Sequence, residues 1–215
     1  MTDKPVTDFS LREYLSALAG DAPAPGGGSA AALAAALAAA CAEMVGNFTI
    51  GRKKYADVEE QIRAQMRPIA AIRERLTRLV QDDVSAYSAV GAAYAMPKSS
   101  SEEKSARTAA IQEALRGAAE VPLELARQCR ALAGHLPVLL EKGNPNLASD
   151  VGVAARLAEA AFDCAWLNVE VNLAHIEDED FAAITREELD RLSASAHELL
   201  NRTWAGVAKA VTGEG

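Results

Sequence analysis

The sequence predicts an all-α fold, a single domain of long packed helices without a sheet. Half of its 215 residues are hydrophobic but only 5% are aromatic, so its core must consist of aliphatic and alanine side chains, which favours helices. The sustained hydrophobic period is that of an α-helix, and no segment alternates with the period of a strand. Because no linker or internal repeat divides the chain, we expect one domain over residues 1–215.

The first helix is expected over residues 9–18, with Ser10 near its start. Its apolar side chains recur at i, i+3, i+4 and i+7, which places them on one helical face: Leu11, Tyr14, Leu15 and Leu18. Gly20 ends this helix.

A proline- and glycine-rich turn follows and opens into a second helix. Three consecutive glycines, Gly26, Gly27 and Gly28, allow the backbone to approach a ligand closely, and Ser29 occupies the expected N-cap position. A helix N-terminus also favours an anion or a carbonyl group. The alternative is a tight connection in which Pro23 and Pro25 stiffen the turn and Ser29 only caps the helix.

The second helix contains only Ala, Leu and Cys from residue 30 to residue 42. A helix that is small and apolar on every side is expected at the centre of a soluble bundle, partly at a subunit interface. A membrane span needs roughly 20 apolar residues, and here Glu43 and Asn47 interrupt the run. The basic segment Arg52–Lys54 then follows one helix length from the glycines, so we expect no membrane segment.

A long amphipathic helix is expected over residues 57–95, with a possible kink at Pro68. Steps of seven along its apolar stripe place Asp83 and Arg73 toward the interior, whereas Asp82 points away. A bare buried carboxylate is unfavourable, so Asp83 is either a catalytic group or the partner of Arg73 or another arginine.

The next segments alternate between helices and polar connectors. Residues 96–101 form a connector, either a lid or an ordinary exposed loop. Helices are expected over residues 102–133, with a kink at Pro122, and over residues 134–142, where Gly143 ends the second one.

Turn-forming residues at 144–152 open a helix that runs to about residue 173, with Ser149 or Asp150 as its cap. Asn168 and Asn172 interrupt its apolar surface and predict an amide ladder between helices. After an acidic connector, a last amphipathic helix is expected over residues 185–211.

Charge and residue usage exclude several classes of function. A net charge of −8 without a large basic face argues against a nucleic-acid partner. The three cysteines and three histidines lack the spacing of metal ligands or disulfides, so we expect no metal and a reducing, cytoplasmic location. The first ten residues contain no apolar run typical of a signal peptide, which favours the same compartment.

Three separated motifs resemble the cyclodeaminase and cyclohydrolase family of one-carbon folate metabolism. They are APAPGGGSAAALAAALAAA followed by GRKKY, DDVSAYSAV with AMPKSSSEEKSAR, and NPNLASDVG with LNVEVNL. The resemblance covers nearly the whole chain. Its stand-alone length is most similar to bacterial methenyltetrahydrofolate cyclohydrolases, because the formiminotetrahydrofolate cyclodeaminases are typically the C-terminal part of a longer protein.

The resemblance implies an all-helical homodimer that acts on a tetrahydrofolate derivative without a metal or redox cofactor. Asp83 or Asp150 would be the general base and stabilise the cationic substrate, and the backbone of Gly26–Ser29 would contact the pterin. Lys53 or Lys54 would bind the anionic glutamate tail. Further candidate substrate-binding residues are Tyr55, Asn144, Asn146 and Asn168.

Two alternatives to the cyclohydrolase remain. Cyclodeamination, in which N10 attacks a formimino carbon and ammonia leaves, would use the same pocket and the same carboxylate. A non-catalytic folate-binding protein would keep the scaffold and bind folate tightly without turnover.

Overall fold

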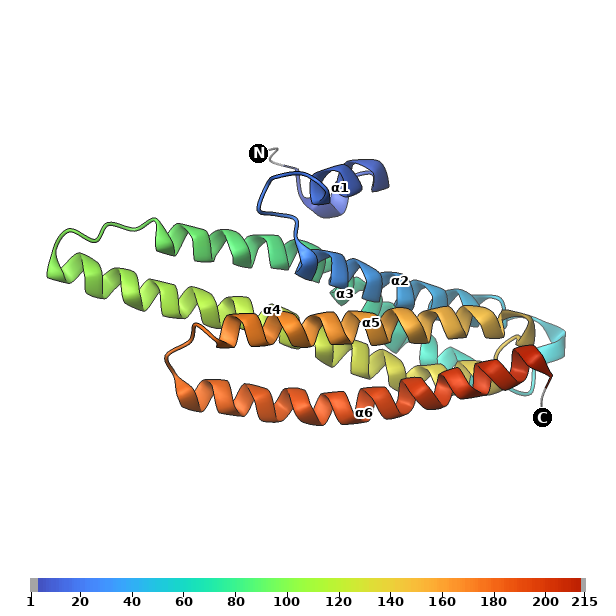
Figure 1. Ribbon diagram of the computed structural model, residues 1–215. Helices are drawn as coiled ribbons and strands as arrows, with labels where there is room; N and C mark the ends of the chain where they lie inside the picture. Colours follow the sequence, from blue (N-terminus) through green and yellow to red (C-terminus); the bar gives the residue numbers. More distant parts are fainter. Residues whose placement is uncertain (1–3, 214–215) are drawn as a thin grey trace.

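The computed structural model describes residues 4–213, and this range forms an elongated all-α bundle without a strand (Figure 1). The prediction of an all-α fold is therefore confirmed. Six α-helices are present in the described range: α1 Leu11–Leu18, α2 Gly27–Asn47, α3 Glu59–Tyr94, α4 Ser101–Lys142, α5 Ala148–Leu173 and α6 Glu179–Thr212. Three short 3-10 helices accompany them: Val6–Asp8, Lys53–Tyr55 and Pro145–Leu147. The ends of the predicted single domain, residues 1–3 and 214–215, lie outside the described residues.

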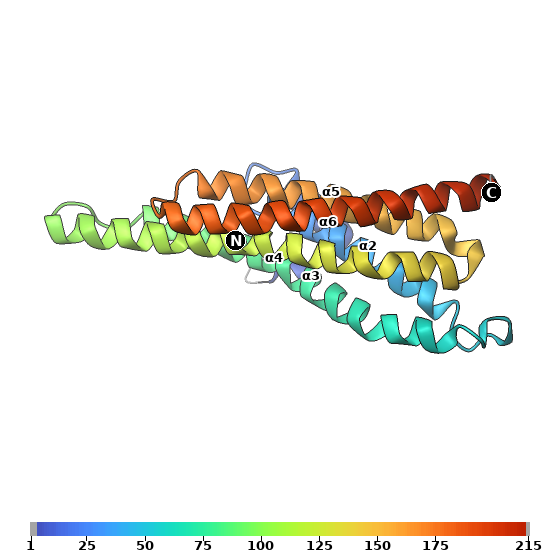
Figure 2. The ribbon, with the colours of Figure 1, turned by 90° about the horizontal axis from the view of Figure 1, so that it is seen from below.

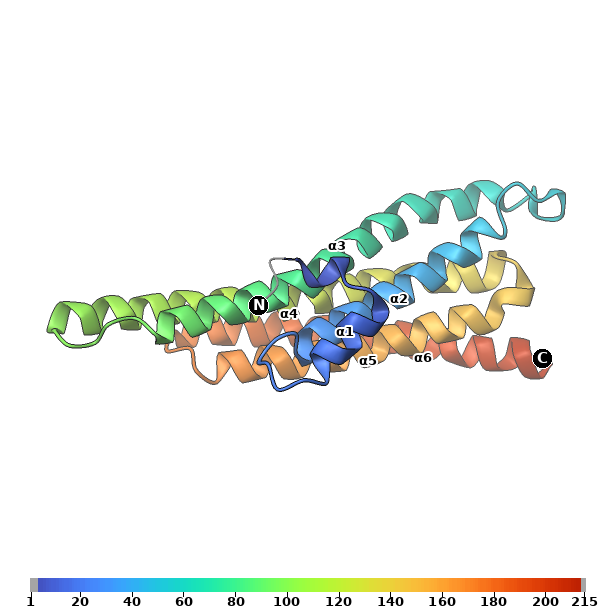
Figure 3. The ribbon, with the colours of Figure 1, turned by 90° about the horizontal axis from the view of Figure 1, so that it is seen from above.

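The helices α2 to α6 run lengthwise and reverse direction at each connection, while the short α1 lies over α2 (Figures 1 and 3). Helix α2 packs against α3, α4 and α5, so it has the central position expected from its composition. Helix α2 is antiparallel to α5, so the start of α2 lies near the end of α5 (Figure 3). The connected ends of α3 and α4 extend past α5 and α6 (Figure 2).

Small side chains form the contact between α2 and α5. Ala35, Ala38 and Ala42 of α2 are fully buried, as are Ala154 and Ala158 of α5. Alanine lets two helix backbones approach closely, and larger side chains such as Phe162, Leu132 and Leu189 fill the remaining core. One helix in residues 4–213, α2, is long and apolar enough to cross a membrane by length and composition, and over half of its apolar window is buried in this bundle.

The helix starts confirm some sequence predictions and correct others. Ser10, which was expected near the start of α1, is its N-cap and forms a capping box with Glu13. The N-cap of α2 is Gly26 and not Ser29, because Gly27 and Gly28 already adopt helical conformation. The N-cap of α5 is Leu147, so the prediction of Ser149 or Asp150 in that position is wrong.

Two helices are longer than the sequence predicted. Helix α4 runs without a break through Gly134, because the buried leucines on either side outweigh the cost of about 1 kcal/mol for glycine in a helix. Helix α6 begins at Glu179 with Asp178 as its N-cap, so part of the predicted acidic connector forms its first turn. Acidic side chains are favourable there because the helix N-terminus carries a partial positive charge.

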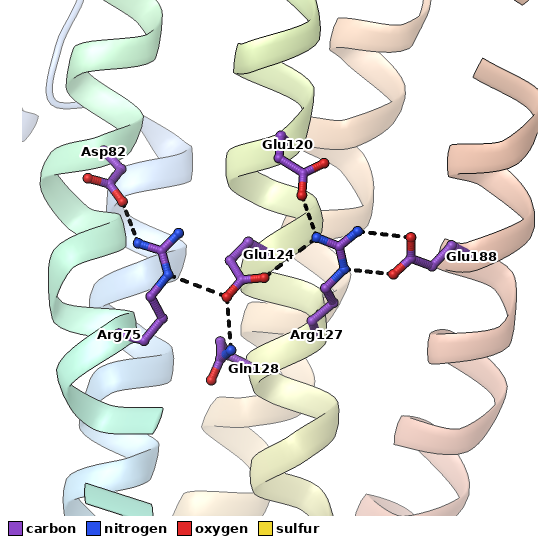
Figure 4. A network of polar contacts seen from close by, with 7 residues as sticks. All are labelled: Arg75, Asp82, Glu120, Glu124, Arg127, Gln128 and Glu188. Carbon is purple, nitrogen blue, oxygen red and sulfur yellow. Dashed lines mark hydrogen bonds and ion pairs between the residues drawn. The ribbon is translucent and has the colours of Figure 1, made fainter. Parts of the chain in front are cut away.

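A network of ion pairs and hydrogen bonds connects α3, α4 and α6 (Figure 4). Arg75 of α3 contacts Glu124 of α4, with 3.3 Å between Nε and Oε1. Arg127 of α4 binds Glu188 of α6 through two hydrogen bonds, of 2.6 Å and 2.9 Å. Glu124 and Arg127 are three residues apart on α4, which lies between α3 and α6 (Figure 4). The two contacts therefore connect the three helices at nearly the same height.

Candidate functional site

A cavity of about 470 Å³ lies where the glycine turn and the start of α2 meet α3, α4 and the end of α5. Gly26, Gly27 and Gly28 line one side, and Asp83 and Asn168 line others. Asp83 is the only carboxylate in the lining, which contains neither lysine nor arginine. An apolar cavity of about 240 Å³ beneath α1 and an apolar groove of about 630 Å³ between α5 and α6 have no carboxylate in their linings. The cavity around Asp83 thus combines a partly buried carboxylate with the glycine turn, whereas the carboxylates in two further surface pockets, Glu13 and Glu141, are exposed.

Asp83 is held against the first turn of α2. The backbone N–H of Ser29 donates a hydrogen bond of 2.8 Å to its Oδ2. A Cβ atom built on Gly28 would lie 2.1 Å from Oδ1 of Asp83, so only glycine leaves room for this carboxylate. Burial raises the pKa of Asp83, and the hydrogen bond from Ser29 partly opposes that rise.

The side chain of Ser29 points into the protein behind Asp83. Its hydroxyl is fully buried and donates to the carbonyl of Val80 over 3.0 Å. Because this donation uses its proton, Tyr14 must be the donor in the 2.9 Å hydrogen bond between the two hydroxyls. Ser29 therefore positions Asp83 through its backbone, and its hydroxyl connects α1, α2 and α3.

The alternative of an ion pair between Asp83 and Arg73 is wrong. Arg73 pairs with Glu43 of α2 at 2.6 Å and with Glu74 at 2.9 Å. Ten residues along α3 separate Arg73 from Asp83 by about 15 Å, which is too far for a contact. The adjacent Asp82 points away from the cavity and pairs with Arg75 at 2.7 Å.

The two asparagines of α5 both line the cavity. The amide of Asn172 donates to the carbonyl of Ala118 in α4 over 3.2 Å and to Asn168 O over 2.8 Å. The amide of Asn168 donates to Cys164 O within its own helix. The predicted amide contact between helices is thus made by Asn172, and Asn168 faces the cavity without bridging to another helix.

A second group of predicted residues lies beyond the other end of α2. Tyr55 donates a hydrogen bond of 2.9 Å from its hydroxyl to Oδ1 of Asn144, which also accepts from Asn146 N–H at 3.1 Å. Lys53 and Lys54 are exposed, and the ammonium of Lys54 lies 5.4 Å from the centre of the Tyr55 ring. Asn144 therefore links the segment that follows α2 to the segment that precedes α5.

Asp150 does not share the cavity with Asp83. It lies in the first turn of α5, where its charge adds to burial in raising the pKa of Cys41, a residue in the second half of α2. The 21 residues of α2 span about 30 Å. The structure thus brings together Gly26, Gly27, Gly28, Asp83 and Asn168. It places Asp150, Lys53, Lys54, Tyr55, Asn144 and Asn146 away from them.

Sequence reasoning missed the three ring-bearing side chains of the cavity: Tyr87, Tyr94 and His175. The two tyrosines follow Asp83 by 4 and 11 residues, a helical spacing that the sequence already contained. His175 lies just past the end of α5, where no periodicity signals its direction. Within residues 4–213, no group of three or more His, Cys, Asp or Glu side chains is arranged to hold a metal ion.

Comparison with known proteins gives consistent similarities. A family model described as formiminotransferase-cyclodeaminase matches residues 10–191. A methenyltetrahydrofolate cyclohydrolase of Methylorubrum extorquens is 43% identical over 202 residues, which cover 94% of this chain and 97% of that protein. The formimidoyltransferase-cyclodeaminase of Rattus norvegicus is 38% identical over 194 residues, which cover 90% of this chain but 36% of that protein. The crystal structure of a formiminotetrahydrofolate cyclodeaminase from Thermotoga maritima superimposes with a TM-score of 0.86 at 37% identity, covering 96% of this chain and 99% of that one.

Proposed function

The chain belongs to the formiminotransferase-cyclodeaminase family, and from this premise we propose that it is a methenyltetrahydrofolate cyclohydrolase. The reaction adds water to 5,10-methenyltetrahydrofolate and gives 10-formyltetrahydrofolate. The similarity to a cyclohydrolase along almost the full length of both chains supports this assignment. The observation that carries the chemistry is the single, half-buried carboxylate of Asp83 at the glycine turn.

Asp83 is suited to two tasks in this reaction. The methenyl carbon lies between two nitrogens and shares their positive charge, so a nearby carboxylate stabilises the bound cation. The same carboxylate accepts the proton of a water molecule as its oxygen bonds to that carbon. The added hydroxyl group then loses its remaining proton and its oxygen becomes the formyl C=O as the bond from the carbon to N5 breaks. N5 keeps the electron pair of that bond and takes up a proton, so the formyl group remains on N10 and one proton is released overall.

The other cavity residues would orient the substrate. The backbone at Gly26 and Gly27 offers space for the flat pterin, and the exposed ring of Tyr87 is available for stacking. The guanidinium of Arg107 lies over the ring of Tyr94, 5.5 Å from its centre. Asn168 supplies an amide for hydrogen bonds to the pterin edge. These contacts would hold the methenyl carbon beside Asp83, which is the main requirement for adding water to an activated carbon.

Formiminotetrahydrofolate cyclodeamination is the second candidate. We expected the stand-alone length to favour the cyclohydrolase, but the Thermotoga maritima chain called a cyclodeaminase is matched over 99% of its own length. Chain length therefore does not separate the two activities. In this reaction Asp83 would accept the proton from N10 as N10 attacks the formimino carbon, and ammonia would leave.

Purified protein should be offered each substrate separately while ultraviolet absorbance is followed. A cyclohydrolase removes the methenyl chromophore, whereas a cyclodeaminase produces it from the formimino substrate. The proposal predicts much faster loss from the methenyl compound than formation from the formimino compound. Tight folate binding without turnover of either substrate would instead identify a non-catalytic folate-binding protein.

The proposed function also includes a cellular location, an oligomeric state and the absence of a cofactor. The chain would act in the cytoplasm, as a homodimer, without a metal or redox cofactor, since hydration of an amidinium needs only positioned water and a proton acceptor. The exposed apolar side chains Leu37, Leu167 and Val171 favour a dimer, because water-exposed apolar surface is lost when two copies associate. Sedimentation at micromolar concentration should give twice the chain mass of 22.6 kDa.

A further inference from the structure

The side-chain amide of Asn172 has a fixed orientation in the wall of the cavity. Its nitrogen donates to two backbone carbonyls, that of Ala118 at 3.2 Å and that of Asn168 at 2.8 Å. A carbonyl oxygen can only accept a hydrogen bond, so the amide nitrogen must face both carbonyls and both of its hydrogens are used. In residues 4–213 the only buried side-chain nitrogen or oxygen without a partner is Nε of Arg116. Oδ1 of Asn172, to which no group in that range donates, is therefore accessible, and Asn172 lines the cavity.

The carbonyl of Ala118 needs this side chain because Pro122 follows it by four residues in α4. In an α-helix each carbonyl accepts from the N–H group four residues later, and proline has no N–H group. Ala118 and Pro122 are both buried, and a buried carbonyl without a donor is unfavourable. Asn172 supplies the missing donor from the neighbouring helix α5.

We propose that Asn172 presents only a hydrogen-bond acceptor to the bound substrate, selecting the pterin edge that carries donors, and that Pro122 is the positioning residue that fixes this orientation. The inference rests on the proposed function, because it takes a tetrahydrofolate derivative as the ligand. The pyrimidine part of the pterin carries a 2-amino group beside N3–H, which are two adjacent donors, and an acceptor carbonyl at position 4. Oδ1 of Asn172 would accept from the donor edge.

Asn168 could not make this selection by itself. Its amide nitrogen donates to the carbonyl of Cys164 at 2.7 Å, which leaves one hydrogen and the oxygen for a ligand. It can therefore pair with a donor or with an acceptor. At Asn172, by contrast, the 4-carbonyl of the pterin would meet another acceptor, and both oxygens would lose their donors, which is unfavourable. The two asparagines are one helical turn apart, so they can contact neighbouring groups of one ring.

An uncharged acceptor also suits the proposed chemistry of this cavity. Asp83 is the only carboxylate in the lining and is the proposed base. A second carboxylate nearby would favour the protonated form of Asp83, which cannot accept a proton. The amide oxygen of Asn172 can recognise the pterin donors without adding a negative charge.

The first test measures ligand selection without turnover. Two quinazoline analogues of folate are titrated by calorimetry, one with the 2-amino group and one with a methyl group in its place. The parent should bind the amino compound about 10-fold or more tightly, because the methyl compound leaves the acceptor unpaired. In Asn172→Leu this ratio should fall toward one. A change that only loosens the fold would weaken both compounds alike and leave the ratio as it is in the parent.

The second test changes a residue that does not line the cavity. Pro122→Ala gives the carbonyl of Ala118 a backbone donor, which releases one hydrogen of the Asn172 amide, so the ratio should again fall toward one. The matched control is Pro137→Ala, because Pro137 also lies inside α4 but away from the cavity lining. This control should keep the parent ratio. An equal fall in the control would attribute the effect to a general change in α4 and overturn the proposal.

A double variant shows whether Pro122 acts through Asn172. Asn172→Leu alone leaves the carbonyl of Ala118 without a donor, whereas in Pro122→Ala/Asn172→Leu the backbone N–H at position 122 pairs with it. The double variant therefore remains a test even if the single leucine variant does not fold. Its ratio should equal that of Asn172→Leu, or stay near one where that variant cannot be measured. Effects that multiply would mean that the two residues act independently.

The outcomes separate this inference from the proposed function. If neither folate substrate is turned over but the binding ratios change as expected, the proposed function fails and the acceptor role of Asn172 stands. If turnover is present but the parent binds both quinazolines equally, or binds neither, the inference is wrong and the proposed function stands. The same holds if Pro122→Ala keeps the parent ratio, because Asn172 would then be oriented without the proline.

Discussion

The backbone N–H of Ser29, in the first turn of α2, donates a hydrogen bond of 2.8 Å to Oδ2 of Asp83, in the middle of α3. This bond uses an N–H group that would otherwise lack a partner at a helix start, and it fixes the carboxylate beside the glycine turn. Oδ2 is therefore occupied, and Oδ1 is the oxygen available to a water molecule in the cavity.

Asp83→Asn should lower turnover by about 100-fold or more, the usual contribution of a positioned base, while the protein remains folded. The asparagine keeps the shape of the side chain but cannot accept a proton at neutral pH. The matched control is Asp82→Asn, which alters the neighbouring ion pair with Arg75 and should leave kcat close to the parent value. Steady-state kinetics with a melting curve checks both variants, and full activity of Asp83→Asn would remove Asp83 from the mechanism.

Activity and stability should depend on pH in opposite ways through Asp83. Its pKa is raised by burial, so kcat/KM should increase with pH through a midpoint above the ordinary Asp value of about 3.9. Because the pKa of Asp83 is higher in the folded than in the unfolded chain, folding favours the protonated carboxyl. The stability that this preference contributes is fully present below the unfolded pKa and is lost as pH rises through the folded pKa. The melting temperature of Asp83→Asn relative to the parent should therefore rise from acidic to neutral pH. A constant difference would contradict the raised pKa.

Gly28→Ala should reduce turnover strongly because its methyl group would occupy the position of Asp83 Oδ1 and displace the carboxylate. The control is Gly117→Ala in α4, where a Cβ atom meets nothing within 4 Å. That variant should raise the free energy of unfolding by about 0.5–1 kcal/mol, the usual gain for alanine over glycine in a helix, with activity unchanged. Parent-like turnover in Gly28→Ala would show that the carboxylate has another acceptable position.

Lys53→Ala and Lys54→Ala should each raise KM, more for polyglutamylated than for monoglutamylated substrate, with kcat almost unchanged. This is the expected result of losing a contact made equally in the bound substrate and the transition state. Higher salt should have the same effect in the parent, because it screens exposed charges. The control is the exposed Lys209 at the end of α6. If Lys209→Ala changes KM as much as the two variants do, the effect reflects net charge alone.

The helical period and the composition were sufficient to predict the fold class and the central position of α2. Asp83 could also be found, because a carboxylate on an apolar stripe is visible in a single sequence. The start of α2 could not be predicted correctly, because serine is found at N-cap positions more often than glycine and therefore pointed to Ser29. The reason for glycine at position 28 is the close contact with Asp83, which only the structure shows. Nor did the sequence indicate that Asp83 lies at the start of α2 and Asp150 toward its other end, which depends on the antiparallel packing of α2 and α5.

The ion pairs of Arg75 and Arg127 have a consequence for how the helices are aligned lengthwise. A slide of about 5.4 Å between α3, α4 and α6 would separate Arg75 from Glu124 and Arg127 from Glu188. The charged residues on this side thus hold α3, α4 and α6 in one axial register, together with the leucine and isoleucine side chains buried between these helices. The ion pair between Glu43 of α2 and Arg73 of α3, at 2.6 Å, connects the two helices that carry Gly28 and Asp83, so the height at which Asp83 meets Gly28 depends on side chains that never contact the cavity.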